Sequence, residues 1–461
     1  MHNDEPLFHD DPTTPGWLVE RIFHEDAIEC PWLPKGSSPD ADCEQRRGRI
    51  TALRNKISVC KSPLRRTDRC FGHRGAPLVA PEETVASWQI AAASGAGYLE
   101  CDVSVTGDLD FVCRHSNCDL DFTTDLVPKH PDLNQKCSVP FVPGSGKKAT
   151  CCTFDFTMEE IGRLCAIMES SVNASAVSRS GYILGPPGFR TGAVAGERCH
   201  KVVPYSEHLK LLKRSGYHAI PELKDTATKR TQKFLHSKGK DIYWLADRAA
   251  DALRDYGFQA WPAVGVPATI GATWGVMQTF DHRVAEHWKK TRGSNISVEY
   301  MWNSMPPAGA NCSKADDCGG EALLRHFVGL GMDMFSPPIQ LLITSGPGRS
   351  IVPSATAQAL KEMKVRSIGA FSLERQGCSP KPDGPIMPQR PSQFLGPCWD
   401  PGAKYYSSVD GTAAWQHADV LVVLDTLFKE VGLKSLFSDF PATVSAYVNC
   451  VLTPAPSVVY V

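Results

Sequence analysis

Short runs of alternating apolar and polar residues recur along most of the chain, and stretches with helical periodicity separate them. Alternation is typical of strands, whereas apolar residues three and four positions apart are typical of amphipathic helices. The strand-like runs lie at residues 70–77, 97–106, 218–224, 273–280, 297–303, 332–338, 365–373 and 435–441. The helical patterns lie at residues 83–93, 206–215, 247–256, 281–290, 322–329, 354–363 and 418–431. Eight strands that alternate with helices predict an α/β fold, a (β/α)8 TIM barrel.

Other parts of the chain do not fit this alternation. Residues 1–66 are polar and rich in Pro and Arg, and we expect an N-terminal extension that cysteines hold in place. The barrel is expected to occupy residues 67–450, with a tail at 451–461. Within it, residues 126–200 are too many for a barrel loop and contain five Cys, which predicts an inserted subregion tied by disulfides. Residues 376–411 are rich in Pro and Gly, and we expect a long loop over the barrel mouth.

The charge balance restricts the classes of partner. The 461 residues include 49 Lys and Arg against 50 Asp and Glu, so the net charge is −1 and no broad basic field favours nucleic acid. No apolar stretch approaches the roughly 18 residues of a membrane span. The first residues lack a basic segment followed by an apolar one, so we expect no signal peptide in the chain as given. The oligomeric state stays open at this stage.

The chain contains 17 Cys, twelve of them before residue 200. This density favours disulfides in an oxidising compartment, and therefore a secreted protein. An odd number leaves at least one Cys unpaired within the chain. Zinc is the weaker alternative, because neither Cys113/Cys118 nor Cys312/Cys318 has the spacing of a structural zinc site. The sequons compatible with N-glycosylation begin at Asn173, Asn295 and Asn311.

Ionisable side chains gather at the expected carboxyl ends of the first three strands, where barrel enzymes carry their functional residues. They are His73, Arg74, Glu100, Asp102, Glu222 and Lys224, with His115 on a hairpin-like return at 111–115. The spacing of two residues places Glu100 and Asp102 on the same strand face. Three carboxylates favour a hard cation, Ca²⁺ or Mg²⁺, and an Arg and a Lys beside them indicate a phosphate ligand.

Each of these pairs also has a simpler interpretation. Glu100 and Asp102 alone are compatible with a solvated strand face, and Glu222 and Lys224 with an ordinary ion pair. A single His in a strand is more often a structural residue than a catalyst. Their convergence at three strand ends favours the metal site.

The order of these motifs resembles the glycerophosphodiester phosphodiesterase family, in particular its Cys-rich secreted branch with a phosphatidylinositol phospholipase C-like barrel. The resemblance rests on the HRG motif at 73–75, ProGluGluThr at 81–84, the Glu-x-Asp pair, the second His and the later Glu-x-Lys. It continues through VMQTFD (276–281), FSLER (371–375) and LFSDFP (436–441), and covers roughly residues 68–445. Several ordered motifs at strand positions are more specific than any one alone.

The resemblance implies a role for each matching residue. His73 and His115 would be the general acid and base, and Glu100, Asp102 and Glu222 the metal ligands. Arg74 and Lys224 would contact the phosphoryl oxygens, and Glu82 would orient the HRG loop. The substrate's glycerol side would be lined by Phe371, with Phe280 and Trp302 as further candidates.

Two positions depart from the family pattern. Ser116 follows the second His, where the family usually has Asp, which leaves the orientation of His115 in question. Glu83 replaces the usual Asn and is expected to place an extra carboxylate near the mouth. We expect Asp439 of the last motif to support the barrel rim structurally.

Three functions are compatible with the sequence. The first is a metal-dependent hydrolase that cleaves glycerophosphodiesters such as glycerophosphocholine to glycerol 3-phosphate and an alcohol. The second is a phospholipase D-like enzyme that acts on lysophospholipids, as in similar venom enzymes that usually form a cyclic product. The third is an inactive secreted barrel used for binding, against which the complete set of site residues argues.

Overall fold

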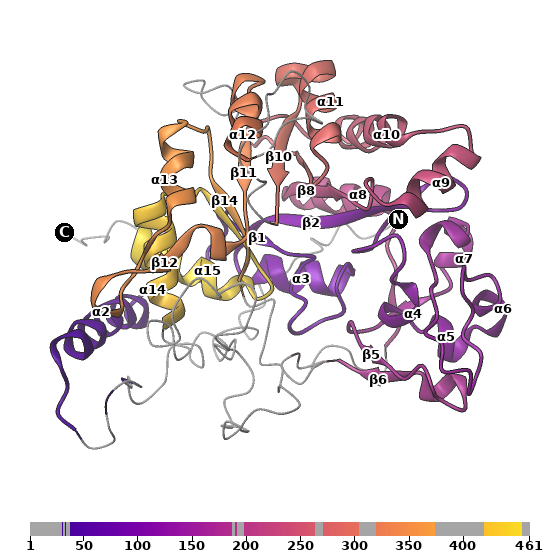
Figure 1. The fold of residues 1–461 in the computed structure, drawn as a ribbon, viewed down its shortest axis with the longest axis horizontal. Helices are drawn as coiled ribbons and strands as arrows, with labels where there is room; N and C mark the ends of the chain where they lie inside the picture. The colour runs from indigo at the N-terminus through magenta and orange to yellow at the C-terminus, as the bar shows by residue number, and fades with distance from the viewer. Residues whose placement is uncertain are drawn as a thin grey trace, which may run out of the picture.

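Eight parallel strands form the barrel (Figure 1). The computed structural model describes residues 30, 33, 37–186, 190, 198–262, 271–303, 320–373 and 419–453. Along the sheet the strands are β11 (Met334–Ser336), β10 (Ser297–Met301), β9 (Val276–Thr279), β8 (His218–Leu223), β2 (Ala96–Val105), β1 (Thr67–Gly72), β15 (Ser435–Ser438) and β14 (Gly369–Leu373). Parallel bridges from Phe335 to Ile368 and from Pro338 to Phe371 join β11 to β14 and close the barrel. The predicted (β/α)8 fold is confirmed.

Helices connect the strands where the helical periodicity predicts them. They are α3 (Val85–Ala93), α8 (Tyr205–Ser215), α10 (Ile242–Asp255), α11 (His282–Arg292), α12 (Gly320–Gly329), α13 (Ala355–Glu362) and α14 (Asp419–Asp425), which a π-helical turn extends over Thr426–Val431. The helix α10 begins five residues before the expected position, because Asp241 caps it by accepting the Trp244 N–H at 2.8 Å. The sequence patterns did not predict α9 (Lys229–Ser237) or α15 (Pro441–Tyr447).

Alternate residues of each strand point to opposite sides of the barrel wall. On β2, Leu99, Cys101 and Val103 pack outward in the cluster that includes the helices, whereas Tyr98 packs inward with Phe71 and Ile220. The two-residue period therefore places Glu100 and Asp102, like Tyr98, on the inner side. This alternation delivers charged side chains to the barrel interior, above its apolar layer.

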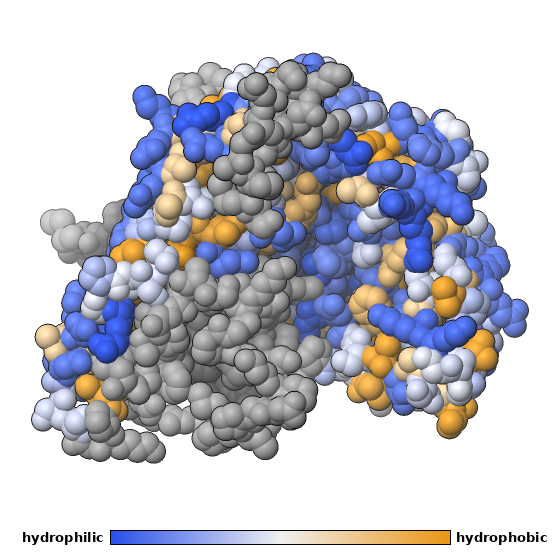
Figure 2. All heavy atoms as spheres, in the orientation of Figure 1, coloured by the Kyte–Doolittle hydropathy of each residue, from blue (hydrophilic) through white to orange (hydrophobic). Residues whose placement is uncertain are grey.

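A second, smaller core lies beside the barrel and is formed by the chain segment that runs from β3 (Phe111–Cys113) to the start of α8. It contains Val112, Leu126, Phe156, Tyr182 and Val202 among others. Its short helices are α4 (Leu120–Thr123), α5 (Leu126–Lys129), α6 (Pro131–Asn134) and α7 (Met158–Ile161), and its strand pairs are β4 (Cys165–Ala166) with β7 (His200–Lys201) and β5 (Ser171–Val172) with β6 (Ile183–Gly185). In Figure 1 these elements lie together on one side of the barrel, and Figure 2 shows a hollowed, hydrophilic surface next to them.

The N-terminal helix α2 (Ala41–Ser58) packs on the opposite side, against α14 (Figure 1). Arg46 donates to Asp419 through Nε at 3.0 Å, and Arg49 donates to Asp425 at 2.9 Å. The hairpin of β12 (Ile343–Ser345) and β13 (Ile351–Pro353) precedes α13.

Six disulfides lie within the described residues, so the expectation of disulfides is confirmed. They are Cys30–Cys43, Cys60–Cys450, Cys101–Cys113, Cys118–Cys152, Cys137–Cys151 and Cys165–Cys199. Five cysteines remain, of which Cys70 is buried within the described residues. The other four, Cys312, Cys318, Cys378 and Cys398, lie outside the described residues, as do Asn311 and the expected loop at 376–411. Across the described part of the chain, each helix is too short or too polar to cross a bilayer.

Candidate active site

Three buried carboxylates meet inside the barrel. Glu100 and Asp102 lie on β2, and Glu222 lies directly opposite Asp102 on the neighbouring strand β8. Their closest ligand oxygens all lie within 4.8 Å of one another. The same face of two adjacent parallel strands therefore produces the cluster that the sequence predicts.

The pKa values of this cluster show the cost of bringing like charges together. Burial, with the charges of Asp102 and Glu222, raises the pKa of Glu100 well above its usual range. Burial also raises the pKa of Glu222 to about 7. Burial opposes ionisation of Asp102, but Lys224 and Arg74 hold its pKa below the usual value. A divalent cation would relieve the repulsion in this cluster.

The donor set fits such an ion. All three groups offer hard oxygen atoms, and the buried oxygens of Asp102 form ion pairs but no hydrogen bond of good geometry with the described residues. Glu83, Cys101 and Cys113 also lie together, but the two cysteines form a disulfide and cannot bind a metal as thiolates. We therefore place the candidate cation at Glu100, Asp102 and Glu222.

Two cations border the carboxylates. Lys224 Nζ lies 2.6 Å from Glu222 Oε1 and 3.5 Å from Asp102 Oδ1. Arg74 Nε lies 2.8 Å from Asp102 Oδ2, and its Nη1 donates to both oxygens of Glu82 at 3.2 Å. The contact with Glu82 fixes the guanidinium beside the carboxylate cluster.

The HRG loop has an unusual backbone. Arg74 has a left-handed conformation (φ 58°), and its N–H donates to Glu100 Oε2 at 2.8 Å. Gly75 follows with φ 89°, and a Cβ at this position would lie 2.6 Å from the backbone of Ser87. Only glycine fits there, because both the conformation and the close approach exclude a side chain.

His73 connects this loop to the last strand of the barrel. Its Nδ1 is hydrogen-bonded to Oδ1 of the buried Asp439, and its Nε2 lies 4.0 Å from Glu100 Oε2. An ionised Asp439 accepts the Nδ1–H and leaves Nε2 to exchange a proton at the carboxylate cluster. The sequence suggested a structural role at the rim for Asp439, whereas the structure places it in contact with His73. The signal was its position after β15, since closure makes β15 the neighbour of β1.

The second histidine follows the hairpin return that the sequence predicts. The strand β3 pairs antiparallel with β2, and the Cys101–Cys113 disulfide links the two. The N–H of Arg114 donates to the carbonyl of Asp102 at 2.8 Å. His115 is the next residue and is half-buried, so its backbone lies beside a candidate metal ligand.

Glu83 differs from the expectation that it adds a carboxylate near the mouth. It is fully buried, has a left-handed backbone (φ 61°) and accepts the N–H of Asp102 at 3.0 Å through Oε1. Burial raises its pKa well above the usual range. Glu83 therefore supports the backbone of a candidate ligand from behind the strand.

An apolar wall occupies other strands of the barrel interior. The rings of Phe280 and Phe371 meet edge to face at 5.4 Å, and Met301 belongs to the same apolar cluster. Trp302 was a candidate for this wall, but it packs outside the barrel and stacks on Tyr300. Because Met301 points inward, the next residue along β10 points outward.

The sequence motifs did not reveal two further polar residues of the interior. Gln278 lies opposite both Glu222 and Glu299 in the strand register, and its amide donates to Glu100 Oε1 at 2.6 Å. Glu299 is fully buried, and its oxygens receive no hydrogen bond of good geometry from the described residues. The sequence signal that could have revealed them is their position on the inward-facing side of β9 and β10.

The replacement Glu299→Gln is expected to stabilise the protein at neutral pH. Burial raises the pKa of Glu299 to about 8, so its stabilising contribution is complete below the unfolded-state pKa and lost as the pH rises through 8. At pH 7 the free energy of unfolding of the native protein should therefore be lower than that of the variant by up to about 3 kcal/mol. Urea unfolding at pH 5, 7 and 8 measures this effect. A variant whose stability gain does not grow with pH would contradict it.

A family model matches the part of the chain that contains most of this site. Residues 73–255 match the model of the Glycerophosphoryl diester phosphodiesterase family, a range that includes all the predicted catalytic, metal-binding and phosphate-binding residues but not the aromatic candidates Phe280, Trp302 and Phe371. Over these residues the chain is similar to that family. The resemblance inferred from the motifs is confirmed, and the family with which it is shared consists of phosphodiester hydrolases.

The individual proteins to which this chain is similar are distant from it. A curated extracellular protein of Arthroderma benhamiae is 27% identical over 278 residues, which cover 60% of this chain and 97% of that protein. An Oleispira antarctica phosphodiesterase, solved with its product sn-glycerol-3-phosphate, is 14% identical with a TM-score of 0.44, covering 82% of this chain and 96% of its own. The glycerophosphodiester phosphodiesterase of Thermotoga maritima is 12% identical with a TM-score of 0.39, covering 82% and 96%.

Proposed function

We propose that the protein is a metal-dependent glycerophosphodiester phosphodiesterase that releases sn-glycerol 3-phosphate and an alcohol. The observation that carries the proposal is the buried triad of Glu100, Asp102 and Glu222, with His73 within 4.0 Å of one member. The family match supports the reaction class. Ca²⁺ and Mg²⁺ are the candidate ions, because all three donors are carboxylates.

The residues of the chain divide the work of hydrolysis. One imidazole, of His73 or His115, removes a proton from water as its oxygen bonds to phosphorus. The other imidazole gives a proton to the departing alcohol as the second P–O bond breaks. Asp439 holds the His73 ring so that Nε2 faces the cluster. A bound divalent cation would supply electrostatic stabilisation of the phosphoryl oxygens.

Arg74 and Lys224 add fixed positive charge at the same place. Burial lowers the pKa of Arg74, but Glu82, Asp102 and Glu100 together raise it well above its usual value. Burial also opposes the charge of Lys224, but Asp102 and Glu222 raise its pKa above the usual value, so both groups stay cationic at neutral pH. We assign them to the phosphoryl oxygens, and Phe371 with Phe280 to the apolar side of the substrate.

We also propose an extracellular location. Six disulfides and the extracellular relative support it, because such bonds persist in oxidising compartments. Of the sequons within the described residues, Asn295 is exposed and Asn173 half-buried. The candidate for N-glycosylation is therefore Asn295.

The direct test measures glycerol 3-phosphate released from glycerophosphocholine by the purified protein. Turnover is expected to disappear with EDTA and to return with Ca²⁺ or Mg²⁺, because the triad needs a cation to offset its charge. Phosphorus NMR of the product provides the control for reaction type. A cyclic phosphate would indicate the phospholipase D-like alternative. No turnover with either metal would refute the proposal.

A further inference from the structure

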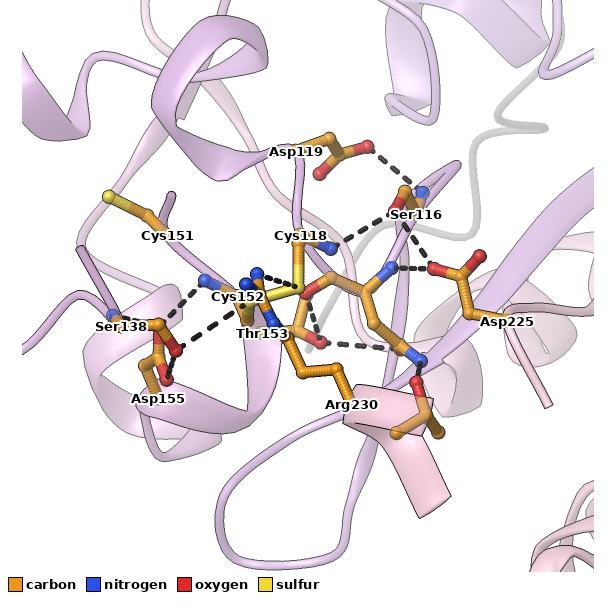
Figure 3. Close-up of a disulfide and its surroundings, with 12 residues drawn as sticks. Ser116, Cys118, Asp119, Ser138, Cys151, Cys152, Thr153, Asp155, Asp225 and Arg230 are labelled. Carbon is orange, nitrogen blue, oxygen red and sulfur yellow. Dashed lines mark hydrogen bonds between the residues drawn. A yellow bond between two sulfur atoms is a disulfide. The ribbon is translucent and has the colours of Figure 1, made fainter. Parts of the chain in front are cut away.

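The turn after His115 is held by a carboxylate that lies just after another strand, β8. We define the His115 turn as residues Ser116–Asp119. Ser116 Oγ donates to Asp225 Oδ2 at 2.8 Å, and the N–H of Asn117 donates to the same oxygen at 2.7 Å (Figure 3). One carboxylate oxygen thus binds a side chain and a backbone group of the two residues that follow His115.

The position of Asp225 follows from the end of β8. Lys224 directs its ammonium group to Glu222 and Asp102, and the next residue turns the chain with a left-handed backbone (φ 55°). The carbonyl of Asp225 then accepts hydrogen bonds from the N–H and the hydroxyl of Thr228, both at 3.0 Å. A left-handed conformation costs a non-glycine residue roughly 1 kcal/mol or more, so these contacts must hold it.

Other contacts fix the far side of the turn. The Cys118–Cys152 disulfide ties it to the neighbouring segment (Figure 3), and Asn117 Oδ1 accepts the N–H of Val105 at 3.0 Å. Asn117 Nδ2 also donates to Thr231 at 2.9 Å. These anchors remain when the Asp225 carboxylate is removed. Its loss should therefore relax the segment next to His115 without releasing the whole turn.

We propose that Asp225 is a positioning residue for His115. Its carboxylate holds the backbone after the histidine in the orientation that aims the imidazole at the substrate. Asp225 itself does not contact the reacting atoms. The inference rests on the proposed function, since it assigns His115 an acid–base role, and it adds the residue that resolves the orientation left open by Ser116.

Steady-state kinetics on glycerophosphocholine test this role. In Asp225→Ala, kcat is expected to fall about 10- to 100-fold, as for other supporting residues, while KM changes little. Asp225→Asn keeps an oxygen acceptor and should retain most of the activity. Ser116→Ala should lower kcat less than Asp225→Ala does, and should have little further effect in the Asp225→Ala background, because the two groups share one hydrogen bond.

Asp241→Ala provides the matched control. It removes a carboxylate that accepts a backbone N–H in the same connection, at the start of α10 rather than at the His115 turn. Its kcat should stay near that of the wild type. Equal kcat values for the two alanine variants, or an Asp225→Asn variant as impaired as Asp225→Ala, would overturn the inference.

The histidine itself can be observed without turnover. With ¹³C-labelled histidine, the imidazole signal of His115, assigned with His115→Gln, is expected to move in Asp225→Ala and to stay in place in Asp241→Ala. An unchanged signal would also overturn the inference. If the wild type does not cleave the substrate, the proposed function fails, whereas this measurement still decides whether Asp225 positions His115.

Discussion

His73→Ala is expected to lower kcat at least about a hundredfold while the protein stays folded. The imidazole is hydrogen-bonded to Asp439 on one side and lies 4.0 Å from Glu100 on the other, so its loss removes a proton-exchanging group from the candidate metal cluster. Turnover of glycerophosphocholine at saturating metal and the melting temperature should be measured together. The protein should stay folded, because the His73 side chain is partly exposed and lies just after the carboxyl end of β1.

Asp439→Asn is the comparison that separates chemistry from positioning. The amide keeps the size of the side chain but loses the charge that favours the Nδ1–H form of His73. Its kcat should fall by less than that of His73→Ala, on the order of tenfold. Near-normal turnover in His73→Ala would remove this histidine from the mechanism.

Glu222→Gln should lower metal-dependent turnover by a similar factor, at least about a hundredfold. The amide keeps the packing but removes one of three carboxylates from the candidate metal site. Metal affinity, measured by isothermal titration calorimetry, should weaken in parallel. In the wild type, affinity should increase as the pH rises through about 7, where burial places the pKa of Glu222, because the proton must leave before a cation binds.

Glu299→Gln is the matched control for this experiment. Glu299 is also a buried glutamate that points into the barrel. It lies on β10, two strands from Glu222 on β8, with Gln278 on β9 between them. It lies outside the triad, so its replacement should leave the metal affinity near the wild-type value. Metal binding by Glu222→Gln that equals the wild type would exclude Glu222 as a ligand.

The sequence predicted the barrel and the identity of the acidic cluster because both depend on local periodicity. A spacing of two residues is enough to place Glu100 and Asp102 on one face, whatever the rest of the fold. The alternation of strands and helices then places the strand ends at one mouth. The cysteine content likewise predicted disulfides, although pairs such as Cys118–Cys152 depend on the folded backbone.

The remaining features depend on which strands become neighbours. Asp439 reaches His73 only because β15 closes the barrel against β1, and Glu83 lies behind β2 because its loop has a left-handed backbone. The helix α9 was not predicted because its segment is rich in Lys and Arg and only two of its residues, Thr231 and Leu235, are buried, which leaves a weak apolar pattern. Such features come from tertiary contacts, which periodicity does not encode.

The disulfide between Cys60 and Cys450 spans 390 positions and joins the segment before β1 to the segment after β15. During synthesis at roughly 5–20 residues per second, Cys60 must wait on the order of half a minute or longer for its partner to leave the ribosome. Other cysteines emerge first, and several of their native partners lie only 12 to 14 positions away. The covalent link between these two ends of the barrel therefore forms later than the short-range disulfides can, and the thiol of Cys60 must be kept from pairing with another cysteine until Cys450 has emerged.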